Sequence, residues 1–185
     1  PFPVDRPGET LHPGVETILA QLGVADRLAA GVGSRHAGIR IQWGSENRFE
    51  PYGRDSSGAW LGYQVRRVEF DALLLDRACE LGVAVRRPCS ARSVVTTNGI
   101  VSGVMTTDGM MTAPMVVDAS GRSNSMRPEL AIERKSYSMS LVARYGYAEG
   151  SLPELDEIPQ LIGNSSGWLW MAMICPGLYQ WTRVA

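Results

Sequence analysis

The sequence has 185 residues, of which 44% are hydrophobic and 20% charged, so a packed core is available and wholesale disorder is excluded. Its 18 basic and 19 acidic side chains give a net charge of −1, which argues against a nucleic-acid-binding protein, because such proteins need a basic surface. Three scattered cysteines support neither a disulfide framework nor a zinc site, and no apolar run approaches the roughly 18 residues of a membrane span. We therefore expect a soluble, cytoplasmic protein without a metal site.

Two helices are expected in the first half of the sequence. An apolar stripe with i, i+3, i+4, i+7 spacing over 15–22 predicts a helix that ends at Gly23, with a short further turn through Leu28. The strongest helix signal covers 68–81, where one face is apolar and Gly82 follows as the stop.

Apolar runs beside the strong helix predict a sheet. Residues 83–85 and 115–117 are short apolar runs that read as buried strands, and helix 68–81 lies among such strands along the chain. This order predicts right-handed crossovers and a mostly parallel sheet, that is, an α/β fold. The alternating residues beyond 134 predict a separate antiparallel sheet.

A meander is expected over 91–113. Asn98-Gly99 and Asp108-Gly109 each separate two apolar segments, and these dipeptides favour type I′ turns because both turn residues have positive φ. Residues 1–11, rich in Pro and Gly, predict an extended loop. Alternation of apolar and polar residues predicts further strands over 37–43, 60–65, 137–148, 167–174 and 178–184.

The run from Asp118 to Arg122 follows the second apolar segment. Open α/β sheets bind ligands beyond the carboxyl ends of their strands, where Asp118 can accept hydrogen bonds from ribose hydroxyls. Gly121 would let the backbone approach a phosphate closely. The alternative is an aspartate that only caps its own turn.

Other polar candidates lie near the predicted helix starts. Arg67 just before helix 68–81 could reach a phosphate with help from the helix dipole, or it could be a solvated arginine, with Arg66 as its competitor. Glu9 either caps a helix or touches a ligand. The only histidines, His12 and His36, have no partners spaced for a catalytic triad or a metal site, so we expect surface or loop residues.

Trp168 and Trp170 flank one residue of a predicted strand and should point to the same face. Two interpretations remain open for this pair. The side chains either pack in an ordinary core or interface, or they form the aromatic wall of a ligand pocket.

Five runs in the same order resemble the FAD-dependent monooxygenase and flavin-dependent halogenase superfamily. They are Gly8-Glu9-Thr10-Leu11-His12-Pro13-Gly14, Trp43-Gly44-Ser45, Arg67-x-x-Phe70-Asp71-x-x-Leu74 with Ala78 and Gly82, the meander, and Val117-Asp118-Ala119-Ser120-Gly121-Arg122. The resemblance implies an α/β fold of the glutathione-reductase type: part of a Rossmann-like FAD-binding domain with an inserted three-stranded β-meander, plus part of a β-rich substrate domain. It implies a partial FAD-binding domain over 1–134, with strands 37–65 as candidates for the substrate domain, and a partial substrate domain over 135–185.

The resemblance also implies FAD as cofactor and NAD(P)H as co-substrate. By analogy, the cofactor-binding residues are Glu9, Thr10, Gln64, Arg67, Asp118 and Gly121. The first two would lie beside the flavin, Arg67 would bind the phosphate or ribose region, and Gln64 would line the same pocket. The last two would belong to a second nucleotide motif that serves FAD and NAD(P)H.

Two elements of the superfamily are missing from this sequence, the opening Gly-x-Gly-x-x-Gly loop and a late Gly-Asp motif. The sequence also has no initiator Met and no signal peptide, and it stops within a predicted strand. We therefore expect part of a longer chain. Without the phosphate-binding loop, we expect this stretch alone to bind FAD weakly and to be inactive.

One position argues against halogenation. Flavin-dependent halogenases use a lysine to hold and deliver the oxidised halogen. This lysine lies three residues before an isoleucine in the strand that follows the helix. Ile39 matches that isoleucine, so His36 occupies the position of the lysine. Lys135 is the only lysine among 18 basic residues. Of the halogenase motif Trp-x-Trp-x-Ile-Pro only the two tryptophans, Trp168 and Trp170, are present.

The resemblance therefore implies an enzyme, an NAD(P)H-fed, FAD-dependent monooxygenase that hydroxylates an aromatic or peptide-borne substrate. Its partner would be a small molecule or a protein, with His36, Trp168 and Trp170 as candidate pocket residues. No catalytic residue can be named. The alternatives are a flavin reductase or dehydrogenase of the isoprenoid-reductase type, or a non-catalytic domain with a degenerate nucleotide site.

Overall fold

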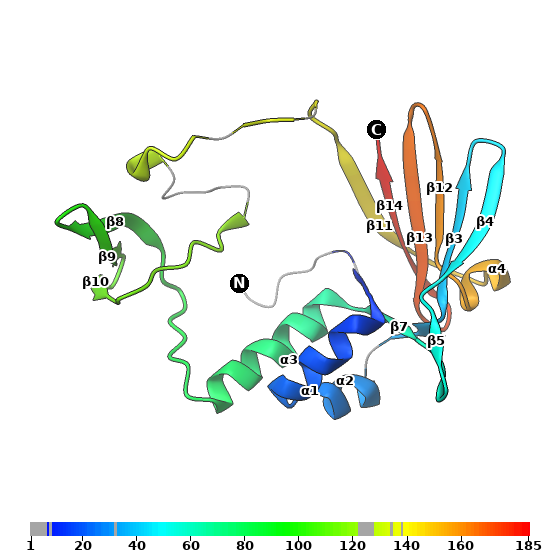
Figure 1. The fold of residues 1–185 in the computed structure, drawn as a ribbon, viewed down its shortest axis with the longest axis horizontal. Coiled ribbons are helices and arrows are strands. Elements are labelled where there is room, and N and C mark those ends of the chain that lie inside the picture. The colour runs from blue at the N-terminus through cyan, green and yellow to red at the C-terminus, as the bar shows by residue number, and fades with distance from the viewer. Residues whose placement is uncertain (1–6, 8, 32, 122–127, 134, 138) are drawn as a thin grey trace. The chain divides into compact units, whose positions relative to one another are not determined.

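The computed structural model describes residues 7, 9–31, 33–121, 128–133, 135–137 and 139–185. The chain divides into two compact units, one formed by residues 1–83 and 140–185 and the other by residues 84–139. Figure 1 labels most of their helices and strands.

Most elements belong to the first unit. They are β1 (Glu9–Leu11), η1 (Pro13–Val15), α1 (Glu16–Leu22), α2 (Ala25–Gly31), β2 (Arg35–His36), β3 (Gly38–Trp43), β4 (Glu46–Pro51), β5 (Arg54–Asp55), β6 (Gly58–Ala59), β7 (Gly62–Val65), α3 (Arg67–Glu80), β11 (Ala143–Glu149), α4 (Pro153–Asp156), β12 (Gln160–Asn164), β13 (Gly167–Cys175) and β14 (Leu178–Val184). The second unit contains β8 (Ala91–Thr97), β9 (Ile100–Thr106), β10 (Gly109–Thr112) and η3 (Pro128–Leu130).

Strand β7 is the centre of a small three-stranded sheet with the order β1-β7-β2. Both neighbours pair with it in antiparallel fashion, and all four of its residues are buried. The expectation of a loop over 1–11 is thus wrong for 9–11, because the backbone of β1 pairs with β7 at Thr10↔Gln64 and the flanking positions.

A six-stranded sheet has the order β11-β14-β13-β12-β3-β4 (Figure 1). Every neighbouring pair is antiparallel except β12 and β3, which are parallel. The expected mostly parallel sheet is therefore wrong for the residues that the structure describes. The strands beyond residue 142 do not form a sheet of their own either, since β3 supplies the backbone partners for the free edge of β12.

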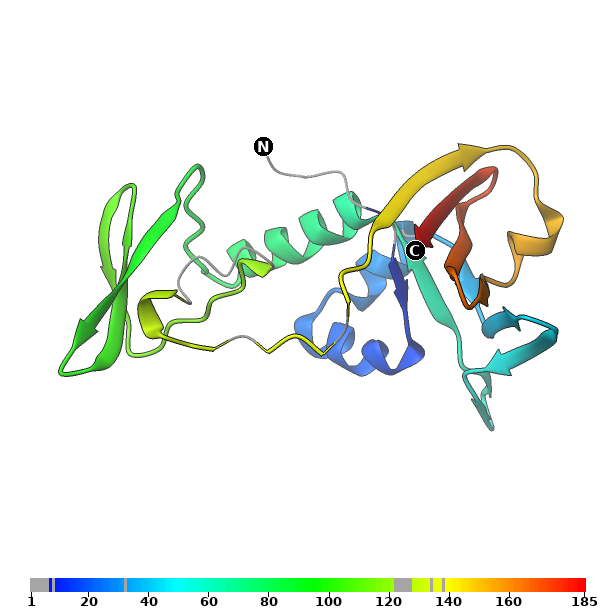
Figure 2. The same ribbon diagram turned by 90° about the horizontal axis from the view of Figure 1, so that it is seen from above.

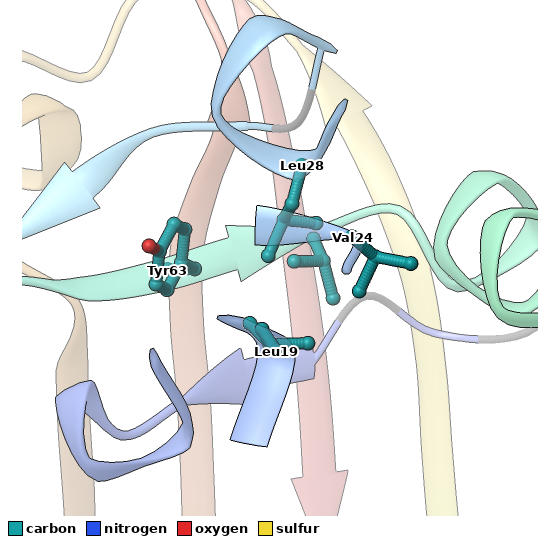
Figure 3. Close-up of a cluster of buried hydrophobic side chains, with 5 residues drawn as sticks. Leu19, Val24, Leu28 and Tyr63 are labelled. Atoms are coloured by element: carbon teal, nitrogen blue, oxygen red, sulfur yellow. The ribbon is translucent and has the colours of Figure 1, made fainter. Parts of the chain in front are cut away.

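The core of the first unit lies between helices α1 and α2 and strand β7 (Figure 3). Its buried side chains are Leu19, Val24, Leu28, Tyr63 and Val65, against which α3 packs Phe70, Leu73 and Leu74. Tyr63 and Val65 point to this core because alternate residues of a strand share a face. The predicted helix end at Gly23 is confirmed, with φ of 72° in the left-handed region that glycine adopts readily.

The second unit confirms the predicted three-stranded meander, β8-β9-β10 (Figures 1 and 2). Asn98 and Gly99 have φ of 54° and 78°, as a type I′ turn requires. The second turn differs from the expectation. Its turn residues are Thr107 and Asp108, and Gly109 already belongs to β10.

Two predicted strands do not form in the part of the chain that the structure describes. Val83 is 55% exposed, and its N–H bonds to the carbonyl of Ala78, so this segment completes the end of α3 instead of entering a sheet. Met115 and Val117 are 78% and 76% exposed, and no described strand pairs with them.

Leu28→Ala tests the core. Leu28 is fully buried, so the truncation should lower the free energy of unfolding by about 2–5 kcal/mol, through lost burial and the cavity left behind. Leu22→Ala is the matched control, because Leu22 is 39% exposed and should cost clearly less. Urea unfolding followed by circular dichroism measures both variants, and equal losses would contradict the assignment of this core.

Candidate functional site

A buried glutamine amide joins the three strands of the small sheet. Gln64 on β7 has 1% of its surface exposed and lies opposite Thr10 on β1. Its Nε2 donates to Thr10 Oγ1 at 2.6 Å and lies 3.2 Å from His36 Nε2 on β2. The sequence named these three residues separately, and the structure brings them together.

The hydrogen-bond partners favour one tautomer of His36. Its Nδ1 lies 3.1 Å from the carbonyl oxygen of Gly38, which can only accept, so Nδ1 carries the proton. Nε2 is then an acceptor and takes the second amide hydrogen of Gln64. A proton on Nε2 would point at the side-chain N–H of Gln64, so two donors would face each other. The arrangement therefore favours the neutral imidazole, and burial acts in the same direction.

Burial lowers the pKa of His36 below its ordinary value of 6.5, and the nearby charge of Arg35 lowers it further, although backbone hydrogen bonds with Gly38 and Tyr63 oppose the shift. The expectation of a surface or loop residue is wrong for His36, which is 3% exposed. Pairing of β2 with β7 turns its ring inward, where it packs against Tyr52 with ring centroids 5.4 Å apart. His12, by contrast, is exposed as expected.

Gly33 allows two segments of backbone to come close together. Its φ is +61°, and a Cβ at this position would lie 1.5 Å from the carbonyl oxygen of Gln64. The next residue, Ser34, accepts a hydrogen bond from Gln64 N at 2.9 Å and donates through Oγ to the carbonyl of Met173 at 2.6 Å. These bonds tie β7, which carries the buried amide, to β13 of the large sheet.

Arg67 begins α3 and forms a two-point ion pair with Asp71. The Nε–Oδ1 distance is 2.9 Å and the Nη2–Oδ2 distance 3.1 Å, with both side chains about four-fifths buried. Arg66, the competing candidate, pairs with Glu69 at the surface. Arg67 thus lies at the positive end of the helix dipole, with its charge balanced by Asp71.

The remaining predicted cofactor residues are less informative. Glu9 lies on β1, but its side chain is outside the described part. In the second unit, Asp118 Oδ1 accepts a hydrogen bond from Ser120 N at 2.9 Å, which is the turn-capping alternative. Gly121 has φ of 68°, and Arg122 lies outside the described residues. Cofactor binding by these residues stays a prediction.

Trp168 and Trp170 share one face of the large sheet, as predicted, and line an open pocket of about 530 Å³. The other lining residues are Trp43, Leu161, Gln180 and Thr182. The third predicted pocket residue, His36, belongs to the small sheet instead. Gln180 and Thr182 were not predicted, although two polar residues at alternate positions of an apolar strand indicate a shared polar surface.

Two features are absent from the residues that the structure describes. No helix there is long and apolar enough to cross a membrane. No three His, Cys, Asp or Glu side chains are grouped so that they could hold a metal ion.

Comparison with known proteins points to one family. The family model described as tryptophan halogenase matches residues 36–175. The chain is 28% identical over 186 residues to a tryptophan 2-halogenase from Chondromyces crocatus, and 27% identical over 197 residues to the flavin-dependent halogenase armH4 from Armillaria mellea. Both matches cover 91% of this chain, but only 34% and 36% of the relatives, so the chain spans about a third of their length.

A solved structure agrees with this result. The myxobacterial chondrochloren halogenase CndH, a variant of FAD-dependent halogenases, matches with a TM-score of 0.85 and 28% identity, over 100% of this chain and 45% of that chain. The expected mixed α/β fold and the resemblance to flavin-dependent halogenases and monooxygenases are confirmed.

The comparisons also bear on the expected reaction. The sequence favoured hydroxylation over halogenation, whereas the family and its relatives make halogenation the closer family activity. The expectation rested on His36 and on the missing Ile-Pro after Trp170, while the family match extends over most of the chain.

The pH dependence of stability tests the neutral imidazole. As the pH falls below 6.5, unfolded His36 takes up a proton that the folded protein resists, so stability should fall between 6.5 and the lower folded pKa. The slope contributed is at most about 1.4 kcal/mol per pH unit. His36→Gln should remove this contribution in urea unfolding at several pH values. An unchanged slope in the variant would show that His36 titrates alike in both states.

Proposed function

This chain belongs to the tryptophan halogenase family, and on that premise we propose that it forms part of an FAD-dependent oxidoreductase that acts on a small-molecule substrate. The observation that carries this proposal is the family match over residues 36–175, on the same fold as an FAD-dependent halogenase. Since the chain spans about a third of its curated relatives, the activity is proposed for the protein that contains these residues.

The first unit offers groups that fit part of FAD. Arg67, at the start of α3, would hold the phosphate or ribose region, with the helix dipole adding to its charge. Thr10 accepts a hydrogen bond from Gln64 and keeps its own hydroxyl hydrogen to offer a flavin acceptor. When bound, FAD would supply the redox chemistry with O₂, and NAD(P)H is the proposed reductant. The other proposed cofactor contacts are Glu9, Asp118 and Gly121.

Gln64 suits positioning better than direct contact with a cofactor. Its two amide hydrogens go to Thr10 and His36, and its Oε1 is buried without a hydrogen-bond partner among the described residues. A flavin would reach this oxygen only if the side chain moved. We therefore assign Gln64 the role of orienting the Thr10 hydroxyl.

Of the two finer reactions, hydroxylation fits the chemistry of this site. His36 occupies the position of the lysine that flavin-dependent halogenases use to hold the oxidised halogen. Its imidazole is buried and neutral, and both nitrogens are engaged, by Gly38 and Gln64. Such a group offers neither a positive charge nor a free amine. We propose that oxygen, not halogen, is transferred to the substrate.

Halogenation is the second candidate, and the family assignment favours it. It is the activity that the names of the matched relatives give. The two candidates share FAD and the scaffold and differ in what the residue at position 36 can do.

The large sheet is the proposed substrate part. We retain the predicted division into a partial FAD-binding domain over 1–134 and a partial substrate domain over 135–185. Strands β3 and β4 share one sheet with β11–β14, which supports assigning these two strands of the range 37–65 to the substrate domain. Strand β7 of the same range belongs to the small sheet with β1 and β2.

Product analysis distinguishes the two reactions. The FAD-loaded protein is supplied with NAD(P)H, O₂ and indole as probe, with and without bromide, and products are identified by mass spectrometry. We expect an oxygenated product whether or not bromide is present. His36→Lys, which restores an amine, should raise bromoindole at least tenfold, equivalent to about 1.4 kcal/mol in the barrier.

Arg144→Lys is the matched control, because it adds a lysine at an exposed position of β11. It should leave the products unchanged. Bromoindole from the unmodified protein would overturn hydroxylation in favour of the second candidate, and a purified protein that retains no flavin would contradict the FAD assignment itself.

A further inference from the structure

A second pocket, of about 410 Å³, lies beside the hairpin of β5 and β6, and we call it the hairpin pocket. Its lining residues come from the segment around η1, from β2 and from this hairpin, all within the first unit (Figure 1). The described lining residues include none of the proposed cofactor residues and none that line the pocket of the large sheet. The lining combines charged side chains with apolar ones, namely Glu16, Arg35 and Asp55 with Trp60 and Leu61.

Asp55 is a carboxylate held in place by its neighbours. Ser57 donates to its Oδ1 through both the backbone N–H and the hydroxyl, and Trp60 Nε1 donates to its Oδ2 at 2.9 Å. The hydrogen bond from the Ser57 hydroxyl, followed by that from Trp60, lowers the pKa of Asp55 to about 2, because each bond stabilises the charged form. Asp55 therefore brings a negative charge to the hairpin pocket at neutral pH.

This negative charge is not balanced by an ion pair in the part of the chain that the structure describes. The donors to Asp55 are neutral groups. Arg35 is the only Lys or Arg among the described lining residues, and its Nη2 lies 2.6 Å from Glu16 Oε1, so these two charges offset each other. His12 accepts a hydrogen bond from Gly14 N through Nδ1, which requires an unprotonated nitrogen. The lining therefore keeps one net negative charge.

Trp60 places an indole ring beside the carboxylate of Asp55. The ring packs against Gly53, where a Cβ would lie 2.8 Å from Cε3 and Cζ3, and the φ of Gly53 is +117°. Trp60 is nonetheless 44% exposed, so part of its indole is accessible from the hairpin pocket that it lines. The face of an indole attracts cations more strongly than that of any other aromatic side chain. A carboxylate and an indole held together thus form a corner that suits a positively charged group.

We propose that the hairpin pocket binds a small molecule that carries a protonated aliphatic amine. The ammonium group lies against Asp55 and Trp60, and the hydrocarbon part of the molecule lies against Pro13 and Leu61. A volume of about 410 Å³ is in the usual range for small-molecule sites. The unbalanced charge of Asp55 repels anions, and a neutral ligand gains neither the ion pair nor the cation–π contact. This site is additional to the proposed oxidoreductase reaction.

Isothermal titration of the full-length protein as purified tests the proposal. Cyclohexylamine and cyclohexanol have nearly the same shape, but only the amine is charged at about pH 7, as a lysine side chain is. We expect the amine to bind about tenfold more tightly, because an exposed ion pair and a cation–π contact each contribute modestly. Since salt screens exposed charges, the preference should shrink in high salt. Equal binding of the two probes in low salt would overturn the proposal.

Asp55→Asn removes the charge and keeps the size of the side chain. The preference for the amine should fall to about threefold or less, because only the contribution of Trp60 remains. Asp76→Asn is the matched control, since Asp76 is exposed on α3 and is not a lining residue, and the tenfold preference should persist. An unchanged preference in Asp55→Asn, or an equal fall in both variants, would contradict the assignment to Asp55. The comparison of probes on the unmodified protein stands even if a variant fails to fold.

A third probe distinguishes a small molecule from a lysine side chain of a partner protein. Lysine capped at both ends carries the same ammonium group on a peptide backbone. We expect it to bind no more tightly than cyclohexylamine, because the pocket has the volume of a small-molecule site. Tighter binding of the capped lysine would overturn the small-molecule assignment in favour of a peptide. These titrations need no turnover, so their outcome is independent of the proposed reaction.

Discussion

The buried strand β7 is the constraint on which the rest of the first unit depends. All four of its residues are buried, and both of its edges are paired, by β1 and β2. One face sends Tyr63 and Val65 into the core beneath α1 and α2. The other face carries Gln64, whose amide hydrogens are divided between Thr10 and His36. The same strand therefore supplies side chains to the hydrophobic core and the amide that contacts the buried histidine.

Much of the local structure could be predicted from the sequence, because its signals act over a few residues. The helix expected over 68–81 is α3, and Asn98-Gly99 forms the expected turn. The pairing of β12 with β3 could not be predicted, since periodicity does not reveal which distant strand offers a partner. Strand β4 escaped notice because its six residues are all exposed and polar-rich, so they show no alternation.

The candidate site was predictable only in part, because periodicity does not reveal which distant segments come into contact. Alternation placed Trp168 and Trp170 on a common face, and the pocket agrees with it. The contact between Gln64 and His36 joins segments 28 residues apart, and only the pairing of β2 with β7 creates it. Gln180 could not be singled out, because its buried Oε1 without a hydrogen-bond partner among the described residues is a feature that no residue pattern encodes.

The central claim is that position 36 holds a neutral imidazole with its proton on Nδ1. Nitrogen-15 NMR of histidine-labelled protein, with His36 assigned through the His36→Gln variant, measures this directly at about pH 6, below the ordinary pKa of the group. The account predicts one protonated nitrogen, Nδ1, and one unprotonated nitrogen, Nε2, as the bonds to Gly38 and Gln64 require. A signal showing both nitrogens protonated, or the proton on Nε2, would contradict it.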